Sequence, residues 1–185
     1  MPRLPATAVI FCGGRSTRMG EDKALFRWRG RPLALHVVSR VRPLFAEILV
    51  SGDPGRYRCL GMPCVPDPVS GIGPLAGLYA GLLAARTHAV FAVACDMPFL
   101  SPGAILALWT RFRSRDAAVP VSPGGPEPLH AFYSRRLLPS IGRALGGKPR
   151  MTSFWGEADV ARVPIAELPG GEGSMRDCDT PADLR

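Results

Sequence analysis

The sequence lacks asparagine and glutamine altogether, and only two of its 23 basic residues are lysines. The other 21 are arginines, so a compositional bias accounts for the formal charge of +8 and the pI near 9.9. The arginines are scattered in short groups such as RVRP, RYR and RFRSR, without the interleaved aromatic residues of a nucleic-acid platform. We therefore expect no nucleic acid among the partners, and steeply salt-dependent binding to random DNA would contradict this.

Long apolar runs and metal or disulfide motifs are missing as well. No apolar stretch approaches the roughly 18 residues of a membrane span, and the short apolar run near the N-terminus is needed as a first strand rather than as a signal peptide. The five cysteines form no C-x-x-C pair and the three histidines lack metal-ligand spacing. Cys12 and Cys95 lie in strand-like runs and are expected to be small buried hydrophobes. These absences predict a cytoplasmic protein without membrane contact.

A chain of 185 residues with 46% apolar content predicts one domain over residues 1–185. Strand-like runs alternate with helix-like segments, which predicts an α/β fold with a mostly parallel sheet and helices on both faces. The run LHAFYS is expected at an edge or in a locally antiparallel position. The predicted strands are 7–11, 47–51, 63–67, 89–95, 117–122, 129–134 and 160–165. The predicted helices begin near Pro32, Pro74, Pro102 and Arg135, and the second is expected to bury Leu75, Leu78, Tyr79, Leu82 and Leu83.

The loop after the first predicted strand has the composition of a phosphate-binding loop. In GGRSTRMGEDK, Gly13 and Gly14 allow backbone amides to approach a ligand closely, while Arg15, Arg18 and Lys23 place cations along the loop. The loop is neither a Walker motif nor G-x-G-x-x-G. In a chain so poor in lysine, Lys23 indicates a need for a compact point charge. The loop therefore predicts a polyphosphate ligand.

The stretch GGRSTRMGEDKALFRWRGRPL resembles the G-G-x-S-x-R-M-G-x-D-K-x-L…G-x-P-L signature of molybdenum cofactor guanylyltransferases, members of the wider nucleotidyltransferase family. The resemblance continues in PDPVSGIGPLAGL, CDMPFLS, EPLHAFYS and DCDTPADL, so it covers nearly the whole chain. It implies a Rossmann-like, three-layer α/β/α fold in which the loop wraps a nucleoside triphosphate and pyrophosphate leaves. Phe11-Cys12 stands where the family usually has Leu-Ala, which narrows the space beside the base.

Several segments of this chain are expected to contact the nucleotide. Asp67 stands between two prolines and is either a turn former or a nucleotide contact beside the Gly73–Pro74 helix start. The resemblance favours the second reading. The expected nucleotide-binding residues are Phe11, Cys12, Gly13, Gly14, Lys23, Ser51, Asp67, Gly73 and Asp96.

Two acidic residues are candidate ligands for Mg²⁺. Asp96 follows a fully apolar strand at the carboxyl end, where a carboxylate faces the crevice of such a sheet, and Mg²⁺ uses one or two carboxylates with phosphate oxygens and water. Asp177 is either a second metal contact or an exposed acidic residue. The expected catalytic residues are Arg18, Lys23 and Asp96, which would act by positioning and charge neutralisation.

The resemblance implies transfer of GMP from GTP to the terminal phosphate of molybdopterin or its metal-loaded form. Guanylyl-transferring members tend to have Gly-Gly at the position of Gly13, whereas Asp177-x-Asp179 looks more like the cytidylyl-transferring relatives. The alternatives are the same chemistry with CTP, another phosphorylated acceptor, or a nucleotide-binding regulator without turnover. The implied partners include proteins that deliver the cofactor or mature molybdoenzymes. Candidate contacts for the acceptor are Glu127, His130, Lys148 and Arg150, although Leu129, Phe132 and Tyr133 beside them equally fit packing roles.

Overall fold

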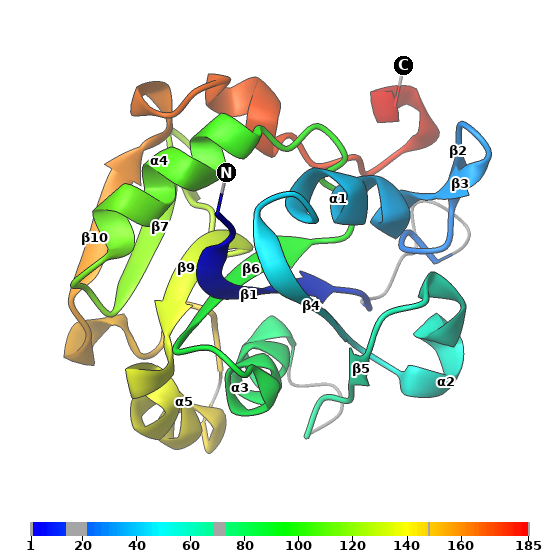
Figure 1. Ribbon diagram of the computed structural model, residues 1–185. Helices are drawn as coiled ribbons and strands as arrows, with labels where there is room; N and C mark the ends of the chain where they lie inside the picture. The colour runs from blue at the N-terminus through cyan, green and yellow to red at the C-terminus, as the bar shows by residue number, and fades with distance from the viewer. Residues whose placement is uncertain (1, 14–21, 69–72, 148, 185) are drawn as a thin grey trace.

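The computed structural model describes residues 2–13, 22–68, 73–147 and 149–184. Its centre is one large sheet, with a separate two-stranded hairpin formed by β2 and β3 (Figure 1). The strands are β1 (Leu4–Phe11), β2 (Arg27–Trp28), β3 (Arg31–Pro32), β4 (Phe45–Ser51), β5 (Cys64–Val65), β6 (Ala89–Ala94), β7 (Ala117–Ser122), β8 (Gly125–Pro126), β9 (His130–Ser134) and β10 (Val160–Pro164). The helices are α1 (Leu33–Val41), α2 (Pro54–Tyr57), α3 (Pro74–Ala84), α4 (Pro102–Phe112) and α5 (Leu138–Leu145).

The large sheet is mostly parallel, as the alternation of elements predicts. Its order is β10-β7-β9-β6-β1-β4-β5, with β8 pairing to β7. Strand β9 is antiparallel to both β6 and β7, which confirms the antiparallel alternative for LHAFYS and places it inside the sheet rather than at an edge. Helices α1 and α4 cover one face, and α3 and α5 cover the other (Figure 1). The fold is therefore the expected three-layer α/β/α arrangement.

Strand β1 is the point at which the order of the sheet reverses. The chain passes from β1 to β4 on one side, then returns to β6 on the other side. Phe11 pairs with Ser51 on β4 and with Ala94 on β6, so the carboxyl ends of the three strands lie level with one another. Ligands of such sheets bind beyond the carboxyl ends at this reversal, so the fold places the site next to the loop that follows β1.

Local sequence explains where the helices begin. Pro74 and Pro102 each occupy the first turn of a helix, where their fixed φ and missing N–H cost nothing. Ser101 caps α4 as expected, because its side-chain oxygen accepts a hydrogen bond from the Ala104 amide at 3.3 Å. No helix in the described part of the chain has the length and apolar content needed to cross a bilayer.

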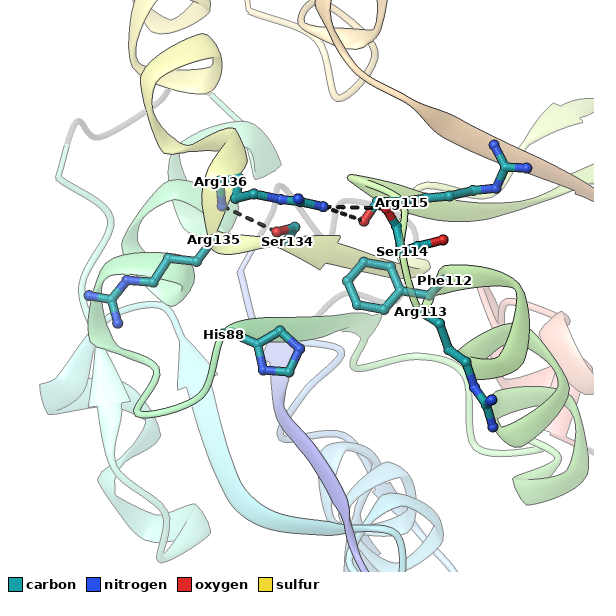
Figure 2. Close-up of a pocket in the computed structure, with 8 residues that line it drawn as sticks. All are labelled: His88, Phe112, Arg113, Ser114, Arg115, Ser134, Arg135 and Arg136. Carbon is teal, nitrogen blue, oxygen red and sulfur yellow. Dashed lines mark hydrogen bonds between the residues drawn. The ribbon is translucent and has the colours of Figure 1, made fainter.

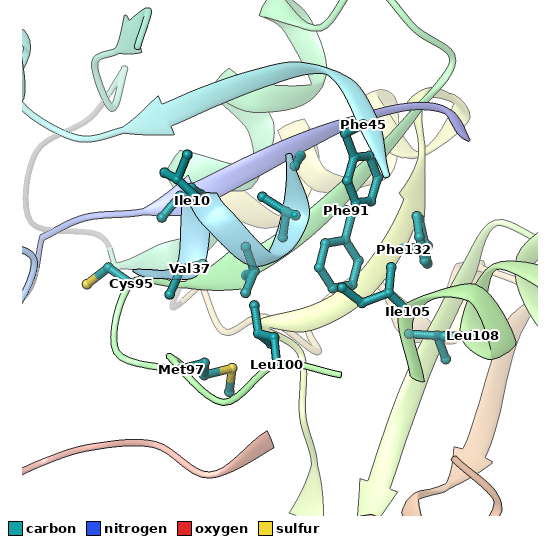
Figure 3. Packing of buried hydrophobic residues seen from close by; sticks show 14 of the residues in the cluster. Ile10, Val37, Phe45, Phe91, Cys95, Met97, Leu100, Ile105, Leu108 and Phe132 are labelled. Atoms are coloured by element: carbon teal, nitrogen blue, oxygen red, sulfur yellow. The ribbon is translucent and has the colours of Figure 1, made fainter. Parts of the chain in front are cut away.

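The core is apolar on both faces of the sheet. Strand β6 is buried along almost its whole length, and Phe91 on it packs against Phe45 and Phe132 with ring centroids 5.6 and 4.8 Å apart (Figure 3). Cys12 and Cys95 are buried as expected.

One prediction about α3 is wrong, because Leu83 is 49% exposed. Leu75, Leu78 and Leu82 already form the stripe that rests on the sheet, and a residue one step further along a helix points about 100° away.

Candidate active site

A cleft of about 670 Å³ lies beyond the carboxyl ends of β1, β4 and β6. Eight of the residues predicted to bind nucleotide line it, namely Phe11, Cys12, Gly13, Lys23, Ser51, Asp67, Gly73 and Asp96. Asp22, Pro74, Ala94, Cys95 and Leu129 also line the cleft, although they were not among the residues predicted to bind the nucleotide. Gly14 and Arg18 lie outside the described residues. The tertiary structure therefore brings together predicted residues that are spread over some 85 positions of the sequence.

Lys23 is held between two carboxylates at this cleft. Its ammonium donates to Asp96 Oδ2 at 2.9 Å and to Asp179 Oδ1. Burial by itself lowers the pKa of Lys23, but the hydrogen bonds to Asp179 and Asp96 outweigh it and raise the pKa well above the ordinary value. Lys23 therefore carries its positive charge at neutral pH and well above it.

The segment that carries Asp177 and Asp179 reaches the cleft from the other end of the chain. The Cys178 amide donates to the Asp96 carbonyl at 2.9 Å, which anchors the segment beside the end of β6. Asp177 does not line the cleft, and the residue as a whole is exposed. Partial desolvation and the charges of Asp96, Glu127 and Asp179 nonetheless raise the pKa of Asp177 to about 6. Several carboxylates therefore repel one another at one edge of the cleft.

The donor set at that edge fits a magnesium ion. Repulsion among the carboxylates of Asp96, Asp177 and Asp179 is the kind that a divalent cation relieves. Among the described residues, no group of three or more His, Cys, Asp or Glu side chains is arranged to hold a metal ion by itself. Mg²⁺ usually keeps several waters and combines one or two carboxylates with substrate phosphates, so a complete protein cage is not required.

Asp22 is a residue of the cleft that sequence reasoning missed. Its carboxylate accepts hydrogen bonds from the Tyr57 hydroxyl at 2.9 Å and the Ala24 amide at 2.9 Å, and pairs with Arg56 Nε at 2.5 Å. These contacts fix the end of the loop to α2 immediately before Lys23. The signal in the sequence was the position of Asp22 next to Lys23, but its partners become visible only in the folded chain.

Ser51 and Asp67 form a second polar pair in the cleft. The Ser51 hydroxyl donates to Asp67 Oδ1 at 3.0 Å. Helix α3 passes very close to this pair at Gly77, where an added Cβ would lie 2.4 Å from Ser51 Oγ and 2.9 Å from a ring carbon of Phe11. Gly77 is therefore required by the close approach of α3 to the ends of β1 and β4.

Replacing Gly77 with alanine is expected to lower the free energy of unfolding by about 1–3 kcal/mol, since Ser51 and its neighbours must shift. Gly142 on α5 is the matched control, because an added Cβ there meets only the Tyr79 ring at an ordinary 3.6 Å. Gly142→Ala is expected to be neutral or to stabilise by up to about 1 kcal/mol. Urea unfolding measures both, and equal stabilities of the two variants would contradict the close packing at Gly77.

None of the predicted acceptor contacts that the structure describes, Glu127, His130 and Arg150, lines the cleft. His130 is wrong as an acceptor contact, because it is fully buried and packs edge-to-face on Phe91 with centroids 5.2 Å apart. Burial lowers the pKa of His130 to about 3, so its ring is neutral. Phe132 and Tyr133 are fully buried and therefore have packing roles, whereas Leu129 lines the cleft. Arg150 is exposed outside the lining, and Lys148 lies outside the described residues.

A second cavity of about 420 Å³ lies at the opposite end of the sheet, where β6 and β7 begin (Figure 2). Two arginines that line it, Arg135 and Arg136, bond to other parts of the protein. Arg135 donates to the carbonyls of Ala85 and Leu83 at the end of α3, and Arg136 pairs with Asp116 at 3.3 Å. Figure 2 shows the side chains of Arg113 and Arg135 pointing away from each other. The lining residues are His88, Phe112, Arg113, Ser114, Arg115, Ser134, Arg135 and Arg136.

A cleft at the reversal point of a mostly parallel sheet, lined by a lysine that pairs with two carboxylates, is where α/β proteins of this architecture bind their ligands. The chain belongs to the MobA-like NTP transferase domain family, which it matches over residues 8–160. It is 34% identical to a probable molybdenum cofactor guanylyltransferase of Pelotomaculum thermopropionicum, over 98% of this chain and 91% of that one.

Solved structures agree with this fold. Molybdopterin-guanine dinucleotide biosynthesis protein A of Archaeoglobus fulgidus superimposes with a TM-score of 0.81 at 23% identity, covering 96% of this chain and 94% of that one. The 2-C-methyl-D-erythritol 4-phosphate cytidylyltransferase of Thermus thermophilus superimposes with a TM-score of 0.70 at 21% identity, covering 95% of this chain and 94% of that one. At such identities the likeness concerns the fold alone.

Proposed function

We propose that the protein transfers GMP from GTP to the phosphate of molybdopterin or molybdenum cofactor, forming the guanine dinucleotide and releasing pyrophosphate in a Mg²⁺-dependent reaction. The observation that carries the proposal is the position of Lys23 in the cleft, where Asp96 and Asp179 hold it at the end of a glycine-rich loop. The family to which the chain belongs and the names of its relatives support the same activity.

The residues of the cleft suit nucleotidyl transfer without a general base. A phosphomonoester has a second pKa near 6, so the attacking phosphate is already largely ionised near neutral pH. One bond forms between that phosphate oxygen and the α-phosphorus of GTP, and the bond from the α-phosphorus to the bridging oxygen of pyrophosphate breaks. Negative charge shifts to the pyrophosphate leaving group during the transfer, and Lys23 would neutralise that charge. When bound, Mg²⁺ would supply further charge neutralisation, held by Asp96 and Asp177.

The direct test is to incubate the protein with molybdopterin, Mg²⁺ and an equal mixture of four nucleoside triphosphates, then to identify any dinucleotide by mass spectrometry. A guanine dinucleotide is the expected product. A cytosine dinucleotide would keep the mechanism and overturn the choice of base. If GTP binds but no dinucleotide forms, the acceptor is not a phosphorylated pterin.

The choice of base is proposed to depend on Gly13. Gly13 lines the cleft, and an added Cβ there would meet only the Tyr57 hydroxyl, at 4.0 Å, among the described atoms, so we expect the methyl group to take space from the larger purine. Gly13 has a φ of +131°, so alanine there also strains the backbone and is expected to weaken the binding of every nucleotide. The informative quantity is therefore the ratio of the GTP and CTP affinities.

In Gly13→Ala, we expect that ratio to fall by about tenfold, the scale of one added methyl group in a binding pocket. Gly61→Ala is the matched control: Gly61 has φ of +73° with no atom within 4 Å of an added Cβ, and it does not line the cleft. The control should keep the wild-type ratio. Titration of fluorescent GTP and CTP analogues measures both, and equal losses for the two nucleotides in Gly13→Ala would remove Gly13 as the selector.

Asp177 is proposed to contribute to the metal site in a pH-dependent way. Its pKa of about 6 lies above the ordinary 3.8, so the folded protein keeps Asp177 protonated near pH 5 and ionised above pH 6. Only the ionised form binds a cation, so the affinity of the GTP-bound protein for Mg²⁺ should rise between about pH 5 and pH 7. The phosphates of GTP titrate in the same range, and Asp177→Asn separates the two effects. Calorimetric titrations should show a smaller rise in Mg²⁺ affinity with pH for the variant than for the wild type. If the Mg²⁺ affinities of the two proteins depend on pH in the same way, Asp177 does not bind the metal.

A further inference from the structure

Two cysteines lie side by side on the floor of the cleft. Cys12 and Cys95 are the residues that follow the paired Phe11 and Ala94 at the ends of β1 and β6. The Cys95 amide donates to the Phe11 carbonyl at 3.2 Å, so the strand pairing continues to this point. Paired positions on adjacent strands are about 4.8 Å apart and point their side chains to the same face. This spacing falls within the Cα separations of about 4.4–6.8 Å at which a disulfide forms.

The cysteine pair can be reached from the cleft. Cys12 is 4% and Cys95 6% exposed, yet both line the cleft, so a small molecule in the cleft reaches them. The hydrogen bond to Cys95 and burial raise the pKa of Cys12 well above its usual range, so the thiol stays protonated and its oxidation requires an excess of peroxide. Cys64 is a poor competitor, because it lies on β5, beyond β4, and two strand spacings of about 4.8 Å exceed what a disulfide spans.

We propose that Cys12 and Cys95 form a redox site whose oxidation to a disulfide changes the lining of the nucleotide cleft. A peroxide oxidises one thiol to a sulfenic acid with release of water. The second thiol attacks that sulfur, the S–S bond forms and a second water leaves, so two thiols and one hydrogen peroxide give one disulfide and two waters. A dithiol reductant reverses the step by exchange.

The disulfide would lie next to two other residues that line the cleft. Cys12 precedes Gly13 at the start of the loop, and Cys95 precedes Asp96, which holds Lys23. Because the backbone spacing already fits a disulfide, a bond of about 2.05 Å between the sulfurs would replace two thiols with one rigid cross-link next to Gly13 and Asp96. Oxidation should therefore weaken nucleotide binding. The chemistry of the pair is independent of the acceptor and base assigned under the proposed function, so it can fail or succeed separately.

The test treats the full-length protein with hydrogen peroxide, blocks the remaining thiols with an alkylating agent, and maps disulfide-linked peptides by mass spectrometry. Binding of a fluorescent GTP analogue is measured on the same samples, before and after addition of dithiothreitol. We expect a linked pair of peptides containing Cys12 and Cys95, at least about a tenfold loss of affinity, and recovery of both on reduction. The binding readout needs no pterin, so failure of the proposed acceptor leaves this test intact.

Two variants provide controls. Cys95→Ala should form no linked peptide and should keep its own nucleotide affinity after peroxide, whatever that starting affinity is. Cys59→Ser removes an exposed cysteine outside the cleft and should respond as the wild type does. The proposal is overturned if peroxide leaves Cys12 and Cys95 alkylatable, links other cysteines instead, or forms the disulfide without changing nucleotide affinity.

Discussion

Replacing Lys23 with alanine is expected to lower turnover at least about a hundredfold, the scale on which loss of one electrostatic stabiliser slows an enzyme. Lys23 is the cation that the described structure places in the cleft at the end of the glycine-rich loop, and its two carboxylate partners keep it charged and oriented. Its removal takes away a positive charge from the phosphates and leaves Asp96 and Asp179 to repel them. The rate loss should therefore appear in kcat as well as in the apparent affinity for GTP.

Lys23→Arg and Arg111→Ala are the controls for this experiment. Lys23→Arg keeps the charge but replaces a compact ammonium with a planar fork, so partial activity is expected. Arg111 pairs with Glu167 at 3.0 Å on the exposed side of α4, and its removal should leave turnover unchanged. Steady-state kinetics with thermal unfolding as a check on folding measures all three variants. Near-normal turnover of a folded Lys23→Ala protein would refute the catalytic role.

Asp96→Ala is expected to lower turnover by a similar factor, again at least about a hundredfold. Asp96 lies just after β6 with a side-chain exposure of 15%, and its Oδ2 accepts a hydrogen bond from the Lys23 ammonium at 2.9 Å. Loss of this carboxylate removes a proposed Mg²⁺ ligand and one of the two groups that orient Lys23. The variant should also need a higher Mg²⁺ concentration for half-maximal activity.

Asp179→Asn distinguishes the two roles of Asp96. Asp179 also holds Lys23, so a residue that acted only through the lysine would give the same Mg²⁺ requirement in both variants. A shift confined to Asp96→Ala would support direct metal binding. Asp159 pairs with Arg115 at 2.7 Å on the exposed surface and provides the control. Asp159→Asn should change neither turnover nor the Mg²⁺ concentration for half-maximal activity. Turnover of Asp96→Ala within a few-fold of the wild type would exclude Asp96 from the chemistry.

The fold was predictable because its signals are local. Strand-like runs that are apolar throughout, such as the one around Phe91, are typical of strands covered on both faces, and prolines and Ser101 mark the helix starts. The error at Leu83 has a local cause as well. Periodicity gives the width of an apolar stripe only approximately, and the exact part that meets the sheet depends on how α3 is rotated on it.

The site was predictable in part. The loop and Asp96 carry recognisable patterns, but the role of His130 was wrong because a residue in LHAFYS can face either the cleft or the core. The register of β9 against β6 decides this, and it places His130 opposite Val93, within the core. Asp22 was missed because its partners, Tyr57 and Arg56, are more than 30 residues away along the chain.

The sequence by itself determined the alternation of strands and helices, the phosphate-type loop and the absence of any disulfide or zinc motif, because each of these depends on residues that are neighbours in the chain. Only the tertiary structure decided that Asp179 meets Lys23 across 156 positions, that Gly77 presses against Ser51, and that the two cysteines of the cleft floor are adjacent. Such contacts depend on strand order and register, which long-range packing fixes and no local pattern records.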